Sequence, residues 1–360
     1  DKGRLGVPSG DGGERGQGDK GRLGVPSGDG GERGQGEEIS LSQIKQAEEV
    51  VLEFSQRGYV RRVGLNTQNS SRKQKADTTP DNDLIIQTEI TKTDQDLVVL
   101  TGGGKVYPVK VSDIPPTTGR NERRGTPLVS LLPNAASSAM ESVVSHFFLP
   151  TDLEAAAGII LLTKMGRIKR LSLAEVVSLT NRGLTVIKFK DDDQLLSAQI
   201  TQPNQDLVLA TSGGRLLRFQ VNDQQLPILG RTAVGLQALR LRKQERMIGC
   251  VSISKLNQNL LLISQLGYAK RLPASGLRRG NRGDIGTQAL SFTTKSDTLA
   301  GMVVAEADAE VAIVTNTQRV LRLAADSVSL LGKDGTGDRL TALKPDEKII
   351  SVTPLASTLT

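Results

Sequence analysis

A 13-residue pattern occurs six times in this chain of 360 residues. Each copy has four mostly apolar residues, a Ser or Thr, two variable positions, usually a Gly, and then a run of basic and apolar residues. The copies begin at Val51, Leu97, Ile159, Leu207, Leu260 and Val311. Their starts lie 46, 62, 48, 53 and 51 residues apart, a period that is typical of repeat architectures.

Each copy predicts a β-hairpin, because its apolar run is short and its eighth residue is a Gly that suits a tight turn. The last copy has Gln318 at this position. A Gly-led stretch with alternating apolar residues follows most hairpins, and a further apolar strand such as 247–253 closes the unit, which gives about four strands per repeat. We therefore predict an all-β fold, a six-bladed β-propeller-like ring of four-stranded blades, because a closed ring leaves few exposed sheet edges.

Composition separates a tail from a folded part. Residues 1–36 are a tandem duplication of DKGRLGVPSGDGGERGQG, which predicts a disordered low-complexity linker followed by a folded domain at 37–360. The charges of the tail cancel, so the net charge of +7 belongs to the folded part. The lone Cys250 and the lone His146 exclude a disulfide framework and a Cys/His metal site, and we expect both to be packing residues. The longest apolar run, 155–162, is too short to span a bilayer, so we expect a cytoplasmic protein with no membrane partner.

Basic residues recur at fixed places in the repeat. Position twelve holds Arg62, Arg170, Arg218, Arg271 and Arg322, and position eleven adds Arg61, Lys169 and Lys270. Loop cations follow at Arg123, Arg124, Arg182, Arg231, Arg278, Arg279 and Arg282. Because equivalent positions of a ring lie at equivalent places around its perimeter, these residues predict a curved basic stripe that binds duplex DNA with salt-dependent, sequence-tolerant affinity. Nine aromatic residues in the whole chain argue against stacking platforms for single strands.

Two alternatives stay open. Some position-twelve arginines are followed within a few residues by an acid and could form structural ion pairs at blade edges. These acids are Glu175 after Arg170, Asp223 after Arg218 and Asp326 after Arg322. A propeller can also serve purely as a protein-interaction scaffold. The recurring cation favours DNA over the scaffold.

The serial order of several motifs resembles the C-terminal domain of the A subunit of bacterial DNA gyrase. The motifs include GKVYPVKVSDIP from Gly104, NRGLTVIKF from Asn181 and GYAKRLPASGLRRGNRGDIGTQALSF from Gly267, and the resemblance runs from about residue 48 to 355. It implies a β-pinwheel whose basic rim bends duplex DNA at the nucleoid, joined to an upstream breakage-reunion domain and working with the ATPase B subunit. By this resemblance ATP and Mg serve the intact enzyme, an ATP-dependent type II topoisomerase, and we expect no cofactor and no catalytic residue in this chain.

One motif of that family is missing. The A subunits of gyrases typically carry a Gln-Arg-Arg-Gly-Gly-Lys-Gly box in the first blade, whereas residues 66–83 here contain Arg72, Lys73 and Lys75 but no glycine. The A subunit of the related topoisomerase IV, which also lacks a clear box, is the nearest alternative and implies relaxation or decatenation rather than supercoiling. The six repeats favour the gyrase-like version.

Overall fold

The computed structural model describes residues 46–65, 83–117, 124–133 and 142–356. Residue contacts divide the chain into units 1–46 and 47–360, and the fold below is that of the second unit. The predicted linker at 1–36 lies outside the described residues.

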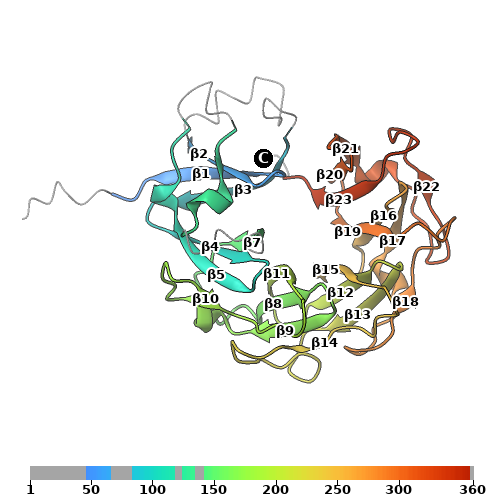
Figure 1. The fold of residues 1–360 in the computed structure, drawn as a ribbon, viewed down its shortest axis with the longest axis horizontal. Helices are drawn as coiled ribbons and strands as arrows, with labels where there is room; N and C mark the ends of the chain where they lie inside the picture. Colours follow the sequence, from blue (N-terminus) through green and yellow to red (C-terminus); the bar gives the residue numbers. More distant parts are fainter. Residues whose placement is uncertain (1–45, 66–82, 118–123, 134–141, 357–360) are drawn as a thin grey trace, which may run out of the picture. The chain divides into compact units, whose positions relative to one another are not determined.

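The second unit consists of six antiparallel sheets that follow one another along the chain, which confirms the predicted six-bladed propeller (Figure 1). Each sheet contains one of the predicted hairpins and, beside its first strand, an inner strand. The inner strands of consecutive blades contact one another from blade 2 to blade 6, so the opposite edge of each sheet forms the outer rim. We number the blades along the chain and give each as its inner strand, first hairpin strand and second hairpin strand. Blade 1 has β3 (Ile85–Lys92), β1 (Glu49–Ser55) and β2 (Tyr59–Gly64); blade 2 has β7 (Val143–Phe147), β4 (Asp96–Thr101) and β5 (Lys105–Lys110); blade 3 has β11 (Leu195–Thr201), β8 (Gly158–Thr163) and β9 (Arg167–Leu171). Blade 4 has β15 (Met247–Ile253), β12 (Asp206–Thr211) and β13 (Arg215–Gln220); blade 5 has β19 (Leu299–Ala305), β16 (Asn259–Ser264) and β17 (Tyr268–Pro273); blade 6 has β23 (Ile349–Pro354), β20 (Glu310–Thr315) and β21 (Val320–Ala324).

The repeat residues explain the hairpins. The apolar run of each first strand is buried, and in blade 4 the Oγ1 atom of Thr211 accepts a hydrogen bond from the backbone N–H of Arg215 across the turn at 3.2 Å. The eighth-position glycines have φ between +77° and +88°, as predicted. Gln318 adopts the same left-handed conformation, with φ of +64°.

The fourth strand of a blade does not come from its own unit. In blades 1 to 5 it is a two-residue strand that crosses over from the following unit and pairs with the second hairpin strand at the outer rim. In order, these strands are β6 (Thr126–Pro127), β10 (Leu184–Thr185), β14 (Leu236–Gln237), β18 (Thr287–Gln288) and β22 (Asp338–Arg339). The prediction that this stretch pairs within its own unit is wrong, because the local sequence pattern does not reveal which sheet edge a strand joins.

Glycine makes the crossover possible. Each donated strand directly follows a glycine with φ between +73° and +95°, at positions 125, 183, 235, 286 and 337. A Cβ atom at Gly337 would lie 2.3 Å from the carbonyl oxygen of Ala269, and one at Gly125 would lie 2.4 Å from that of Val60. The glycines therefore allow both the left-handed turn and the close approach to the host strand.

We call the connecting stretches 114–128, 176–186, 226–238, 277–289 and 328–340 the crossover segments. Short 3-10 turns lead into four of them, at η2 (Val111–Asp113), η6 (Leu173–Val176), η7 (Ala274–Gly276) and η8 (Ala325–Ser327), and η4 (Leu128–Leu131) follows the first. Each of the five hydrophobic clusters fills the space between two consecutive blades. Among the described residues no such cluster joins blade 6 to blade 1, where the backbone N–H of Ala356 donates to the carbonyl oxygen of Ile85 at 3.4 Å.

The lone histidine and the lone cysteine are packing residues, as expected. The His146 ring stacks on Phe54 with ring centroids 4.0 Å apart, and burial lowers its pKa to about 4. Cys250 is buried in the hydrophobic cluster between blades 3 and 4, and this burial raises its pKa to about 12. No helix among the described residues is long and apolar enough to cross a membrane.

Candidate nucleic-acid interface

The position-eleven lysines point into the protein. Both Lys169 and Lys270 have no exposed surface. The Nζ atom of Lys169 donates to the carbonyl oxygens of Val186, Arg231 and Ala233 at 2.6, 2.7 and 3.2 Å. Burial lowers the pKa of each lysine to about 8, so both ammonium groups stay charged at neutral pH.

Lys270 makes the equivalent contacts two crossover segments further along the rim. Its Nζ atom donates to the carbonyl oxygens of Gly332, Lys333 and Gly335 at 2.9, 2.9 and 2.6 Å. Both lysines thus hold a crossover segment onto the blade that receives its strand. Arg61, at the same repeat position in blade 1, is paired with Glu53 in its own hairpin.

The position-twelve arginines are also engaged by protein groups. Arg170 pairs with Asp223, and Arg271 pairs with Asp326 at 3.1 Å. The ion-pair alternative named Asp223 and Asp326 but placed them with the arginines of their own units, Arg218 and Arg322. In the structure each of the two acids pairs with the position-twelve arginine one blade earlier. Glu175, which that alternative placed with Arg170, instead contacts Arg231.

The remaining members of the set behave similarly. Arg218 is buried, with its Nε atom 2.6 Å from Asp206 and its Nη1 atom donating to the carbonyl oxygen of Leu277 at 2.9 Å. Arg62 donates to the carbonyl oxygen of Val111 at 3.3 Å. Arg322 is exposed and lies 3.7 Å from Glu310.

The crossover segments carry the exposed cations. Arg182 and Arg278 are exposed, and the described residues provide neither side chain with a hydrogen-bond or ion-pair partner. Arg231 is 42% exposed and 3.1 Å from Glu175, and Arg124 is exposed over the ring of Tyr59. Arg123 lies outside the described residues, as do Arg72, Lys73 and Lys75.

Two further loop arginines are partly structural. Arg279 is exposed but lies 2.8 Å from Asp206. Arg282 donates from Nη1 to the carbonyl oxygen of Gln237 at 2.8 Å, which fixes its crossover segment to the neighbouring one. Most of the predicted cations that are exposed therefore lie on the crossover segments, with Arg322 on a hairpin strand as the exception.

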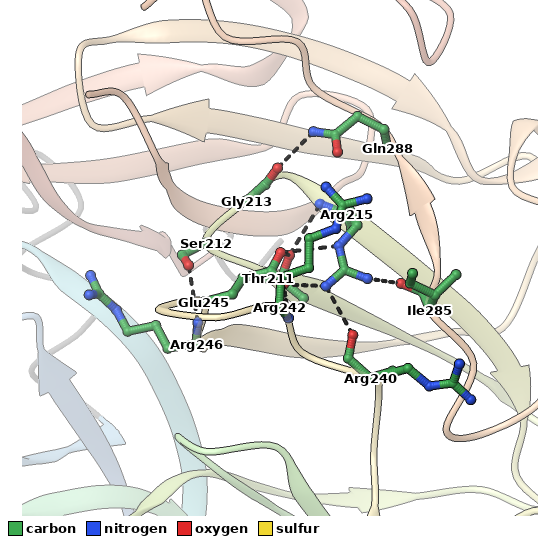
Figure 2. Close-up of polar contacts among 10 residues, drawn as sticks. All are labelled: Thr211, Ser212, Gly213, Arg215, Arg240, Arg242, Glu245, Arg246, Ile285 and Gln288. Carbon is green, nitrogen blue, oxygen red and sulfur yellow. Dashed lines mark hydrogen bonds and ion pairs between the residues drawn. The ribbon is translucent and has the colours of Figure 1, made fainter. Parts of the chain in front are cut away.

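Sequence reasoning missed a basic loop beside blade 4. The stretch RLRKQER contains four exposed cations, Arg240, Arg242, Lys243 and Arg246, and its density of charge was the available signal. In Figure 2 the side chains of Arg240 and Arg246 point away from the buried pair at the centre of the view.

That buried pair, also missed, joins Arg215 and Glu245, whose side chains are 2% and 6% exposed. Glu245 accepts hydrogen bonds from Arg215 and, at 2.6 Å, from the hydroxyl group of Thr211 (Figure 2). Burial alone would raise the pKa of Glu245, but these hydrogen bonds lower it below its usual value. Arg215 also donates to the carbonyl oxygens of Ile285 and Arg240, so it ties together three segments of chain.

The sequence agrees with a known family. The model described as the DNA gyrase C-terminal domain, beta-propeller, matches residues 95–123, 159–202, 205–254, 258–306 and 309–356, more than half of the chain. The chain belongs to this family. The resemblance drawn from the motifs is confirmed, and the matched ranges begin after blade 1.

The curated relatives include A subunits of both DNA topoisomerase 4 and DNA gyrase. The chain is 36% identical over 270 residues to the A subunit of DNA topoisomerase 4 from Synechocystis sp., a match that covers 71% of this chain and 29% of the relative. It is 27% identical over 311 residues to the A subunit of DNA gyrase from Staphylococcus epidermidis, which covers 85% of this chain and 34% of the relative. The chain therefore spans about a third of the length of these relatives.

Solved structures support the fold. The C-terminal domain of DNA topoisomerase IV matches with a TM-score of 0.75 at 20% identity, over 86% of this chain and 94% of that one. The DNA gyrase A C-terminal domain matches with a TM-score of 0.62 at 23% identity, over 86% of this chain and all of that one.

Proposed function

We propose that this chain binds duplex DNA along its outer rim and bends it, as the C-terminal domain of the A subunit of a type IIA topoisomerase. The observation that carries the proposal is the repeated placement of exposed cations on the crossover segments, at Arg124, Arg182, Arg231 and Arg278. Charges placed at successive blades of a propeller follow a curve, which suits a bent phosphate backbone. Lys169 and Lys270 have no exposed surface and are not among the proposed contacts.

Although the six repeats favour the gyrase-like version, the finer assignment that we propose is to an enzyme of the topoisomerase IV type. Two observations favour it: the 36% identity to the A subunit of a topoisomerase 4, and the absence of glycine between residues 66 and 83. Under this proposal the intact enzyme, with its upstream breakage-reunion domain, its ATPase B subunit, ATP and Mg, relaxes or decatenates DNA.

The first test measures DNA affinity against salt. If about 6 to 10 phosphates are neutralised, the slope of log affinity against log salt for a linear duplex should be about −5 to −9. Replacing both Arg182 and Arg278 by Gln should make the slope shallower by about two units, because two phosphate contacts are lost.

The matched control is Arg57→Gln, because Arg57 is an exposed arginine on the turn of the first hairpin rather than on a crossover segment. Its slope should equal that of the parent chain. A slope near zero in the parent, or equal effects of Arg57 and of the rim pair, would contradict the proposed interface. Tighter binding to single strands would do so as well.

The second test separates the two enzyme types. The chain is incubated with nicked circular plasmid, the nick is ligated, and the change of linking number per bound chain is counted. We expect bending with a change well below one turn, because the stretch between β2 and β3 lacks the glycine-rich basic box. A change close to a full turn would assign the chain to the gyrase type.

A further inference from the structure

The outer edge of blade 6 differs from those of the other five blades. Among the described residues its sheet has three strands, in the order β21-β20-β23, so no strand pairs with the outer side of β21. The residue at repeat position ten, for example Ile168 or Leu216, is at most 1% exposed in the other five blades, because the donated strand covers it. Its counterpart Val320 is partly exposed.

The outer edges of blades 1 to 5, which are paired with donated strands, show which kind of segment binds there. In each, a left-handed glycine is followed by two paired residues and then by a residue whose backbone N–H donates to the carbonyl oxygen of the hairpin glycine. In blade 4 this bond runs from Ala289 to Gly214 at 2.8 Å, and in blade 3 from Ala238 to Gly166 at 2.8 Å. The corresponding acceptor in blade 6 is the carbonyl oxygen of Gln318.

The residue at the ninth repeat position restricts which sequence can serve as the fourth strand of a blade. Blades 3 and 4 have an arginine there, and each places a glutamine opposite it, in the pairs Arg167–Gln237 and Arg215–Gln288. Their donated segments read Gly-Leu-Gln-Ala and Gly-Thr-Gln-Ala. Blade 6 also has an arginine at this position, Arg319, so the matching strand is Gly-x-Gln-Ala.

Arg319 itself provides an independent observation. In blade 4 the Nη1 atom of Arg215 donates to the carbonyl oxygen of Ile285, the residue just before the donated glycine (Figure 2). In blade 6, Nε and Nη2 of Arg319 contact Glu347 at 2.7 and 2.6 Å, but no described residue accepts from Nη1. Its side chain is 35% exposed, against 2% for Arg215. The Nη1 atom of Arg319 is therefore in place to donate a hydrogen bond to a carbonyl oxygen of an incoming strand.

We propose that the outer edge of β21 binds an extended Gly-x-Gln-Ala segment of another polypeptide, which completes blade 6 as its fourth strand. The chain's own stretch between β2 and β3 contains no glycine from residue 65 to 84, so its sequence does not match this requirement. Strand addition at an exposed edge is a common mode of peptide recognition, in which backbone hydrogen bonds supply affinity and side-chain positions supply specificity.

The test uses a fluorescent peptide with the sequence of residues 281–292, NRGDIGTQALSF, whose charges cancel. We expect saturable one-to-one binding to the full chain, measured by fluorescence anisotropy. Hydrogen exchange should show new protection at residues 318–324 and none at β13, whose edge already holds this sequence.

Two peptide controls leave the protein unchanged. Replacing the glycine equivalent to Gly286 by Ala should weaken binding at least about tenfold, because a Cβ there would lie 2.8 Å from a host carbonyl oxygen in blade 4. N-methylation of the amide equivalent to Ala289 should weaken it similarly, because the bond to the Gln318 carbonyl is lost.

Four outcomes would overturn the proposal. They are no binding at about 1 mM peptide, equal binding of the Ala-substituted peptide, and protection of 318–324 in the free chain, which would show an edge already filled from within. The fourth is a concentration-dependent dimer that the peptide dissociates, which would identify a second copy of this chain, rather than a different protein, as the occupant.

Discussion

Replacing Glu245 by Gln is expected to lower the free energy of unfolding by about 3–5 kcal/mol, because it leaves the Arg215 guanidinium buried without its counter-charge. Both side chains are almost fully buried, so water cannot replace the lost partner. Arg215 also bonds to carbonyl oxygens in two other segments, which restricts its escape to the surface. Urea unfolding of the full chain, followed by circular dichroism, measures the change.

The matched control is Glu175→Gln, which removes the carboxylate from an ion pair with Arg231 at the surface. Those two side chains are 39% and 42% exposed, so the expected loss is below about 1 kcal/mol. A double-mutant cycle with Arg215→Met should give a coupling energy of at least about 2 kcal/mol between the buried residues. Equal losses for Glu245→Gln and Glu175→Gln would show that burial does not govern the pair.

The blades could be predicted from sequence because their information is local. Each hairpin contains its own apolar run, its Ser or Thr and, in five of six copies, the turn glycine, all within 13 residues. The strand exchange could not be predicted in this way. The stretch RGLTV looks like a strand from its sequence alone, but only the three-dimensional edge of blade 2 decides that residues 184–185 pair with β5.

The candidate interface was harder to predict for the same reason. A recurring cation indicates a repeated role, but the partners that distinguish a structural role from a DNA contact lie far away in sequence. Arg170 meets Asp223 53 residues later, and Lys169 meets the carbonyl oxygen of Ala233 64 residues later. The sequence separates the loop cation Arg278 from Arg218 at repeat position twelve, but only the structure shows that Arg278 is exposed and Arg218 is buried.

The second large expected effect is a loss of stability when a buried repeat-position lysine is replaced. Replacing Lys270 by Met should lower the free energy of unfolding by about 2–4 kcal/mol, because three carbonyl oxygens of one crossover segment lose their common donor. Methionine keeps most of the buried apolar stem, so the loss reports the ammonium group rather than packing. The same urea unfolding measurement applies.

DNA binding of the folded variants should show the opposite order. Lys270→Met should leave the salt slope within about half a unit of the parent, because a side chain with no exposed surface cannot contact phosphate. Arg278→Gln should change the free energy of unfolding by less than about 0.5 kcal/mol but make the slope shallower by about one unit. The paired variants thus separate the two roles that a recurring cation can have in this repeat. If Lys270→Met instead reduced the slope by a unit and left stability unchanged, the repeat-position lysines would be DNA contacts, and the crossover segments would need another anchor.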